Sequence, residues 1–247
     1  MKILCDYHTH TIYSKNNHGK GTIRENVEAA IEMGLKELWI TDHGPSHIAF
    51  GIKRSKFKEV REEIDRLNKE FEGKIKINFG VEANVMSYKG KIDVRKEELQ
   101  YLDGVNVGYH YGIINSDLKS FFYFFIANPL SKLIPPMRNW IREKNTDGMI
   151  NVVKNNNIQI VTHPGDKVAV NIERLAKACE IEGTALEINS SHKNMTEEDI
   201  GEALKTNVMI SVGSDAHSPR KVGNFDKAME RIKNQNVPMD RIINMKG

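Results

Sequence analysis

Short apolar runs rich in valine, isoleucine and leucine alternate with longer amphipathic stretches along the whole chain. Strands are expected at residues 3–6, 37–41, 76–80, 104–107, 159–162, 185–188 and 209–212. Helices are expected between them, at residues 22–33, 55–71, 147–155, 172–182, 196–206 and 225–234. This alternation is typical of βα units, whose strands form a parallel sheet. It predicts an α/β barrel with seven strands, a relative of the eight-stranded (β/α) barrel.

A chain of 247 residues can form one such barrel, so we expect a single domain over residues 1–247. Residues 115–146 interrupt the βα pattern with an aromatic run at 121–125, followed by Pro129, Pro135 and Pro136. We interpret this stretch as an apolar insertion over one face of the barrel. It predicts a lid, a subunit interface or an internally packed segment, because such a segment needs cover.

The charge and cysteine content exclude several classes of protein. The 36 basic and 33 acidic residues are spread evenly, which argues against a nucleic-acid or membrane partner. Cys5 and Cys179 stand in no metal-binding or redox spacing, so a reducing compartment is expected. Neither a secretory signal nor an apolar run of membrane-spanning length is evident. We therefore expect a cytoplasmic protein.

Histidines and carboxylates follow the predicted strands by rule. They are His8 and His10, His43, Glu82, His110, His163, and Asp215 with His217, while His18 lies in the loop after the first strand. The carboxyl ends of barrel strands meet at one rim, so these side chains should converge. So many imidazoles beside two carboxylates would be costly to desolvate without a cation, and the set suits zinc, manganese or iron.

Two further histidines and two aspartates lie near these positions and are not predicted to bind metal. His47 and His192 break the rule and are interpreted as loop or substrate-rim residues. Asp6 and Asp42 adjoin predicted ligands and could orient imidazoles, close turns or pair with a nearby cation.

Three cations lie just beyond ligand loops and are candidates for binding a substrate phosphate. They are Lys167, Arg220 and Lys221.

Six short motifs together resemble the PHP (polymerase and histidinol phosphatase) family, in its subgroup of small stand-alone bacterial phosphatases. They are Asp-x-His-x-His from Asp6, Thr-Asp-His-Gly from Thr41, Gly-x-Glu-Ala-Asn from Gly80, Thr-His-Pro-Gly from Thr162, Leu-Glu-Ile-Asn from Leu186 and Gly-Ser-Asp-x-His from Gly213. The resemblance covers nearly the whole chain. It implies a distorted (β/α)7 TIM-like barrel with three divalent metal ions, zinc first and manganese or iron as alternatives.

The resemblance also implies which residues hold each ion. The first ion would take His8, His10, Glu82 and Asp215; the second would share Glu82 and add His110 and His163; the third would take His18, His43 and His217. Glu82, Asp215 and His217 would form the catalytic core. Two departures are the long apolar stretch at 115–146 and the end of the chain at 243–247, where relatives usually continue into a final helix.

The chemistry of this ligand set agrees with a phosphoesterase. Divalent ions held by neutral imidazoles and only two carboxylates would leave the pocket positive, which suits a phosphate. A metal lowers the pKa of its bound water to about 7, so hydroxide would be available for hydrolysis. We therefore predict a metal-dependent phosphomonoesterase of the hydrolase class that acts on a small phosphorylated metabolite.

Two alternative functions stay open from the sequence. One is an exonuclease that trims nucleotides from oligonucleotide ends, although no basic stripe with interleaved aromatic residues is present. The other is a non-catalytic PHP module that binds only metal or a partner. A homo-oligomer is expected, with a subunit number that the sequence does not indicate.

Overall fold

A seven-stranded parallel sheet forms the centre of the molecule in the computed structural model, which describes residues 2–245. The strands follow one another in the order β1-β2-β3-β5-β6-β7-β8, and the short β4 pairs antiparallel with β3. Their bounds are β1 Cys5–Asp6, β2 Glu37–Ile40, β3 Lys76–Ser87, β4 Lys91–Ile92, β5 Gly104–Gly108, β6 Ile160–Val161, β7 Ala185–Asn189 and β8 Ile210–Gly213. The order confirms the predicted α/β barrel.

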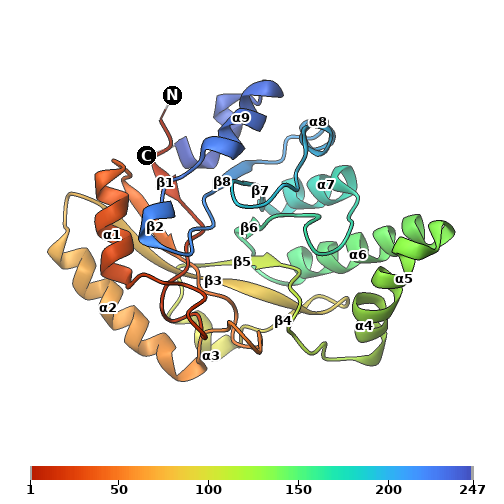
Figure 1. Ribbon diagram of the computed structural model, residues 1–247, viewed down its shortest axis with the longest axis horizontal. Helices are drawn as coiled ribbons and strands as arrows, with labels where there is room; N and C mark the ends of the chain where they lie inside the picture. The colour runs from red at the N-terminus through yellow and green to blue at the C-terminus, as the bar shows by residue number, and fades with distance from the viewer. Residues whose placement is uncertain (1, 246–247) are drawn as a thin grey trace.

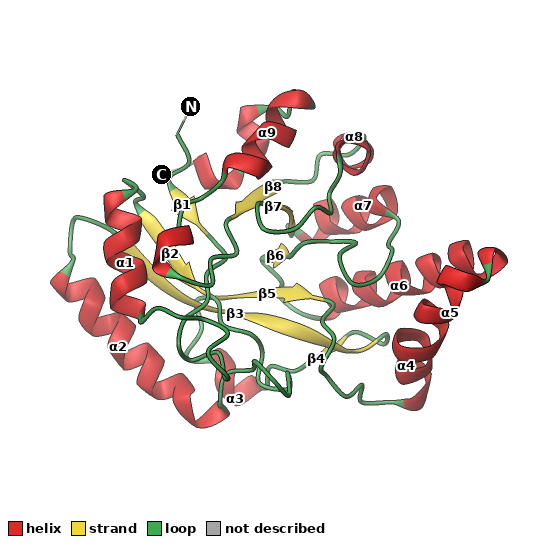
Figure 2. Ribbon diagram, viewed as in Figure 1, coloured by secondary structure: helices red, strands yellow, loops and turns green. Residues whose placement is uncertain are grey.

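Helices surround the strands on the outside of the sheet, as the colours in Figure 2 show. The α-helices are α1 Ile23–Glu32, α2 Phe57–Glu70, α3 Lys96–Leu99, α4 Leu118–Phe121, α5 Asn128–Leu133, α6 Pro135–Asn155, α7 Ile172–Glu182, α8 Glu197–Leu204 and α9 Asp226–Asn234. A π-helical turn, η2 Phe122–Ala127, joins α4 to α5, and the 3-10 helices are η1 Arg54–Lys56, η3 Pro219–Lys221, η4 Met239–Arg241 and η5 Ile243–Met245. No helix among residues 2–245 has the length and apolarity needed to cross a membrane.

The first and last strands approach each other and nearly close the barrel. A single parallel bridge joins Thr9 to Ala216 just beyond the ends of β1 and β8. Where β1 and β8 themselves do not pair, the side-chain amide of Asn244 supplies the hydrogen bonds between them. Its Nδ2 donates to the carbonyls of Cys5 and Val212 at 2.8 Å each, and its Oδ1 accepts the Val212 N–H at 2.7 Å. Asn244 therefore completes the backbone hydrogen bonds that a distorted barrel leaves open.

The helices bury the apolar faces that the sequence pattern predicts. Phe57, Val60, Ile64 and Leu67 recur at helical spacing along α2 and are almost fully buried against the barrel. Burial of each such side chain is worth roughly 1.5–3 kcal/mol. Helix α1 begins at a capping box, in which the Thr22 hydroxyl accepts the Glu25 N–H. These contacts fix the loops that leave the strands.

Three features differ from the sequence-based expectations. β3 runs on to Ser87, because Glu82 and Asn84, the polar residues that suggested a strand end, are buried within it. Residues 118–146 are helical except for the extended Ile134, through α4, η2, α5 and the first half of α6, so the helix expected at 147–155 is only the end of a longer one. Residues 243–245 form η5; residues 1, 246 and 247 of the predicted 1–247 domain lie outside the described residues, and the chain end with them.

Candidate metal centre

The predicted ligands do meet at one end of the barrel. The lateral pairing of strands continues past their carboxyl ends, since His43 bridges to Glu82 and Thr9 bridges to Ala216. This pairing places the segments that follow β1 and β8 side by side, and it places the segment that follows β2 beside Glu82 of β3. The rim is thus built by the parallel order of the strands, as expected for a barrel of βα units.

Glu82 lies at the centre of the cluster and is fully buried. Its Oε2 lies 3.4 Å from His8 Nε2 and 3.0 Å from His43 Nδ1. Its Oε1 lies 3.1 Å from His110 Nε2 and 2.8 Å from His163 Nε2. The two oxygens of one carboxylate therefore face two separate groups of imidazoles, which is the arrangement a bridging ligand needs.

Asp215 joins the first of these groups from the opposite side of the barrel seam. Its Oδ1 lies 3.2 Å from His10 Nε2 and 3.6 Å from His8 Nε2, and the two imidazole nitrogens are 3.2 Å apart. His10 Nε2 is also 3.8 Å from Glu82 Oε2. The four side chains expected at the first ion thus place their donor atoms around one small space.

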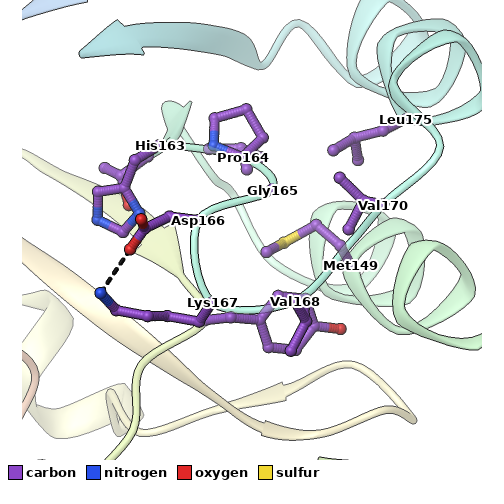
Figure 3. Close-up of a pocket in the computed structure, with 12 residues that line it drawn as sticks. Met149, His163, Pro164, Gly165, Asp166, Lys167, Val168, Val170 and Leu175 are labelled. Carbon is purple, nitrogen blue, oxygen red and sulfur yellow. Dashed lines mark ion pairs between the residues drawn. The ribbon is translucent and has the colours of Figure 1, made fainter. Parts of the chain in front are cut away.

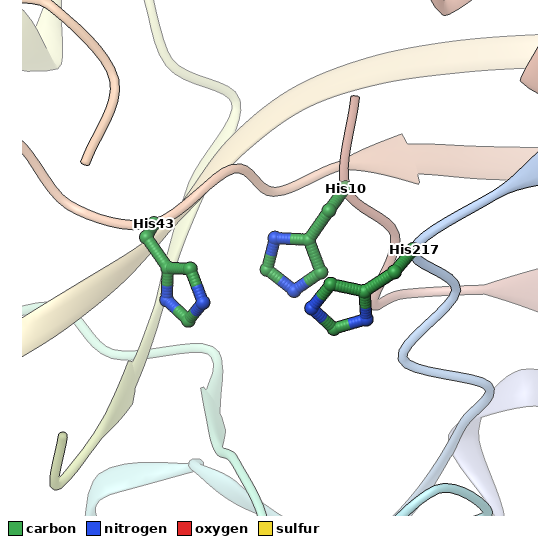
Figure 4. Close-up of side chains that lie close together, drawn as sticks. All are labelled: His10, His43 and His217. Carbon is green, nitrogen blue, oxygen red and sulfur yellow. The ribbon is translucent and has the colours of Figure 1, made fainter. Parts of the chain in front are cut away.

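The remaining histidines gather beside this group. His18 Nε2 lies 3.1 Å from His43 Nε2 and 2.8 Å from His217 Nε2. Phe50 stacks on the His18 ring with centroids 3.9 Å apart, which holds this loop histidine in place. Figure 4 shows the rings of His10, His43 and His217 directed at one another from three separate segments. Donor atoms of these three histidines all lie within 4.8 Å.

The protein atoms alone do not satisfy this cluster. A ring nitrogen carries either one proton or one lone pair, yet His18 Nε2 faces two other imidazole nitrogens at hydrogen-bond distance. Glu82 Oε2 and His10 Nδ1 are buried without a hydrogen-bond partner. Each such orphaned atom costs about 1–3 kcal/mol. Divalent cations would remove this cost, so the residues fit metal ions of the kind that imidazole and carboxylate ligands select.

Burial keeps several of these imidazoles in the form that binds metals. It lowers the pKa of His18 to about 3 and that of His110 to about 4, and it holds the pKa of His10 well below its usual value. Neighbouring imidazoles lower the pKa of each of the three further. The rings are therefore neutral near pH 7, as metal ligation requires.

Two of the ligand positions have unusual backbone conformations. His163 and Asp215 have φ values of 29° and 53°, in the left-handed region that non-glycine residues rarely enter. Such conformations cost of order 1–3 kcal/mol and persist where the surroundings enforce them. Here they turn the two side chains back toward the rim directly after β6 and β8.

Glu187 is a functional residue that the sequence analysis did not single out. It is buried on β7, and its Oε1 lies 2.8 Å from His8 Nδ1. Its Oε2 accepts the His163 N–H at 2.8 Å and the Asn189 side-chain amide at 3.0 Å. The contact to Nδ1 fixes the ring and leaves His8 Nε2 directed at the cluster. The signal was present, since an acid within the apolar run of β7 is rarely buried without a purpose.

Asn84 orients His110 in the same way. Its Oδ1 lies 2.9 Å from His110 Nδ1, and its Nδ2 donates to Asp93 Oδ2 at 2.6 Å. Asp93 also accepts the Asn84 N–H at 2.8 Å. The buried Asp93 therefore fixes the amide, and the amide fixes the imidazole.

Asp42 and Asp6 close loops and do not contact imidazoles. Asp42 accepts the Thr11 N–H at 2.8 Å, the Thr11 hydroxyl at 2.6 Å and the Ser14 hydroxyl at 2.5 Å. Asp6 accepts backbone N–H groups, including that of Gly223 at 3.0 Å. Of the three roles left open by the sequence, the structure supports closure of a turn or loop for both residues.

A cleft of about 420 Å³ opens over the cluster. His47 lies at its edge, as the sequence analysis expected, and so does His192, which contacts Asp166 Oδ1 at 3.0 Å and Asp215 Oδ2 at 3.1 Å. Tyr111 forms another part of the wall. A volume of this size suits a small organic molecule.

Only one of the three predicted phosphate-binding cations lies in this cleft. Lys167 lines it and pairs with Asp166 at 2.5 Å, on the side of the loop away from Leu175 (Figure 3). The hollow drawn behind this loop measures only about 10 Å³ and is a packing gap. Arg220 and Lys221 lie on η3 and line two other surface hollows instead of this cleft. The prediction for these two residues is not supported by their placement.

Comparisons with known proteins agree with this geometry. The model of the PHP domain matches residues 6–191. A probable phosphatase of Caldanaerobacter subterraneus subsp. tengcongensis is 32% identical over 258 residues, covering 99% of this chain and 88% of that protein. A probable phosphatase of Thermoanaerobacter sp. is also 32% identical, covering 99% of this chain and 91% of that protein.

Two solved structures share the fold. Histidinol phosphate phosphatase from Lactococcus lactis subsp. lactis, complexed with zinc, L-histidinol and phosphate, has a TM-score of 0.62 at 21% identity and covers 94% of each chain. A putative histidinol phosphatase from Listeria monocytogenes has a TM-score of 0.64 at 14% identity, covering 89% of this chain and 97% of that chain. At these identities the likeness supports the TIM-like barrel.

Proposed function

The chain belongs to the PHP-domain family, and from this premise we propose that it is a metal-dependent phosphatase that hydrolyses small phosphate monoesters. The observation that carries the proposal is the environment of Glu82. One buried carboxylate presents each of its oxygens to a separate group of imidazoles, at the base of an open cleft. The relatives named as phosphatases extend over nearly the whole chain. We also propose that residues 1–247 act as one catalytic domain.

The ligand set fits three divalent ions, and we favour zinc. His8, His10, Glu82 and Asp215 would hold the first ion; Glu82 with His110 and His163 the second; and His18, His43 and His217 the third. His43 faces two groups, because its Nδ1 lies near Glu82 and its Nε2 lies near His18. When bound, such ions activate water at neutral pH and neutralise phosphoryl charge.

The other residues of the cleft would bind and orient the substrate. Lys167 supplies an ammonium group at the cleft wall, where it can pair with a phosphate oxygen in exchange for Asp166. His192 contacts Asp166 through one ring nitrogen and Asp215 through the other, so it links the cleft wall to a proposed metal ligand. Tyr111 offers an apolar face to the part of the substrate beyond the phosphate.

The size and charge of the cleft favour a metabolite over an oligonucleotide. The lysine that lines it, Lys167, could meet one phosphate beyond the metals, whereas a nucleic-acid strand presents a row of phosphates. The aromatic residues at 121–125 lie on α4 and η2, where Phe121 and Phe122 face solvent and do not line the cleft. A stacking platform for bases would need them in the cleft.

The test is a direct comparison of substrates. The purified protein would be assayed with a panel of small phosphomonoesters and with a labelled oligonucleotide, at fixed metal and pH. We expect kcat/KM to be far higher for at least one monoester. Preference for the oligonucleotide would contradict the proposal, and Glu82→Gln protein would identify activity from contaminating enzymes.

A further inference from the structure

The helical segment at residues 118–142, here called the arm, exposes an unbroken apolar stripe. In Figure 1, α4 and α5 project at the right-hand edge, away from the barrel. Among its exposed apolar side chains, Leu118, Phe122, Ile126, Leu130 and Leu133 recur every three or four residues. Leu118 and Leu133 are 87% and 81% exposed, and Trp140 adds an exposed indole. A stripe at this spacing lies on one face of the arm.

The face that the arm turns toward the barrel combines apolar side chains, such as Phe124 and Ala127, with buried polar ones. Ser120 is buried and donates to Asp117 Oδ2 at 2.8 Å. Asn128 is buried and exchanges side-chain amide hydrogen bonds with Asn145, at 3.0 and 2.8 Å. Ser131 is buried and donates to the Asn128 carbonyl at 2.7 Å. Surface helices of globular proteins usually keep their large apolar side chains inward, whereas this arm exposes large apolar side chains on its outer face as well. That outer face is therefore suited to an apolar medium.

The charges of the arm have one sign. Residues 118–142 include Lys119, Lys132, Arg138 and Arg142 and contain no aspartate or glutamate. Lys119 and Lys132 are exposed, and neither forms an ion pair within residues 2–245. The nearly balanced charge of the whole chain conceals this local excess of positive charge.

We infer that the arm docks on an anionic lipid surface. Exposed leucine, phenylalanine and tryptophan, flanked by lysine and arginine, form the composition that binds in the interface of a membrane. The apolar stripe enters the boundary between headgroups and acyl chains, while Lys119 and Lys132 pair with lipid phosphates. A second copy of the chain fits the same stripe less well. Two-fold pairing of the arm would bring its cations toward identical cations, with no acid in the segment to compensate.

The arm is also continuous with the wall of the cleft. Tyr111, which lines the cleft, packs on the buried Phe124 of the arm with ring centroids 5.3 Å apart. Phe124 in turn stacks on Tyr109, whose hydroxyl donates to the Asn145 carbonyl at 2.8 Å. Docking therefore holds the cleft beside the lipid surface. The inference rests on the arm alone and does not require the proposed function.

The experiment is binding of the full chain to vesicles of phosphatidylcholine, with and without one third phosphatidylglycerol. Sedimentation gives the bound fraction, and tryptophan emission reports the arm. The chain has two tryptophans. Trp39 is buried, so a blue shift on binding comes from Trp140. We expect binding to the anionic vesicles with a blue shift, and weaker binding as salt rises.

Two variants and one control separate the contributions. Leu118→Ser with Leu133→Ser removes the most exposed part of the stripe, and Lys119→Glu with Lys132→Glu reverses its charge. Each pair should weaken binding more than about tenfold. Ile181→Ser is the matched control, since Ile181 is 78% exposed on α7, outside the arm, and its loss should change nothing. Circular dichroism checks that each variant is folded.

Several results would overturn the inference. One is the absence of binding by the unmodified chain, and another is binding that both double variants retain. A third is an oligomer, measured by light scattering, that Leu118→Ser with Leu133→Ser converts to monomer while vesicles bind neither protein. That last result would assign the stripe to a second copy.

Discussion

Replacement of Glu82 by glutamine changes one atom at the centre of the cluster. The side chain is fully buried, and glutamine keeps its shape. Its amide oxygen can still accept the Thr162 hydroxyl, which donates to Glu82 Oε1 at 2.7 Å. The fold should therefore persist. What is lost is the negative charge that we propose two ions share, and an amide bridges cations poorly.

The expected loss follows from the number of groups that face this carboxylate. Removal of an outer hydrogen-bond partner of a metal ligand typically costs about 10–100-fold in metal affinity or activity. Glu82 lies within 3.4 Å of four imidazoles, two at each oxygen, so its neutralisation affects two proposed ions together. We expect kcat/KM to fall by at least about 10³-fold, equivalent to roughly 4 kcal/mol.

The assay is steady-state hydrolysis of the best monoester, with elemental analysis of the same preparations. Glu187→Gln is the matched control, because Glu187 is similarly buried but contacts the cluster as an outer partner, through His8, the His163 N–H and the Asn189 amide. It should lose about 10–100-fold. Near-normal turnover and metal content in Glu82→Gln protein would refute the bridging role. Equal losses in both variants would show that Glu82 is only another outer partner.

Three further predictions concern the cleft and the fold. Lys167→Ala should raise KM by roughly tenfold and change kcat little if the lysine binds the substrate phosphate equally in the ground and transition states; an unchanged KM would remove Lys167 from the substrate site. Burial lowers the pKa of His18 and His47 to about 3 and 4, so below pH 6.5 these two residues bind more protons in the unfolded chain than in the native one. The urea midpoint of metal-free protein should accordingly fall between pH 6.5 and 4, and a flat profile would contradict the neutral imidazoles. The kcat/KM for a monoester should depend only modestly on salt, because few cations contact the substrate; a steep decline would favour the oligonucleotide.

The fold was predictable because its signals are local. Strands of four or five apolar residues alternate with amphipathic stretches, and the histidines stand directly after the strands. Parallel strands direct their carboxyl ends to one side, so this spacing alone predicts the cluster. His8 and His217 are far apart in sequence, yet both line the rim that the order of the strands builds.

The parts that sequence reasoning missed depend on contacts between distant residues. Glu187 acts through His8, and nothing near it in the sequence announces that partner. Asp42 is next to His43 in the sequence, which suggested that it orients an imidazole. Its carboxylate instead accepts a hydrogen bond from the Thr11 hydroxyl. In the arm, a dense apolar run suggested cover, yet Leu118 and Leu133 are exposed, and polar side chains such as Asn128 share the buried face with Phe124. Tertiary hydrogen bonds decide each of these cases.

The central claim is that the cluster holds several divalent ions that act together. The most direct measurement is the metal content of protein prepared without chelators, followed by removal of the metal and titration with zinc or manganese while activity is measured. We predict about three ions per chain, with activity that returns only as the last sites fill. Full activity at one ion per chain would contradict the shared role of Glu82 and, with it, the trinuclear centre.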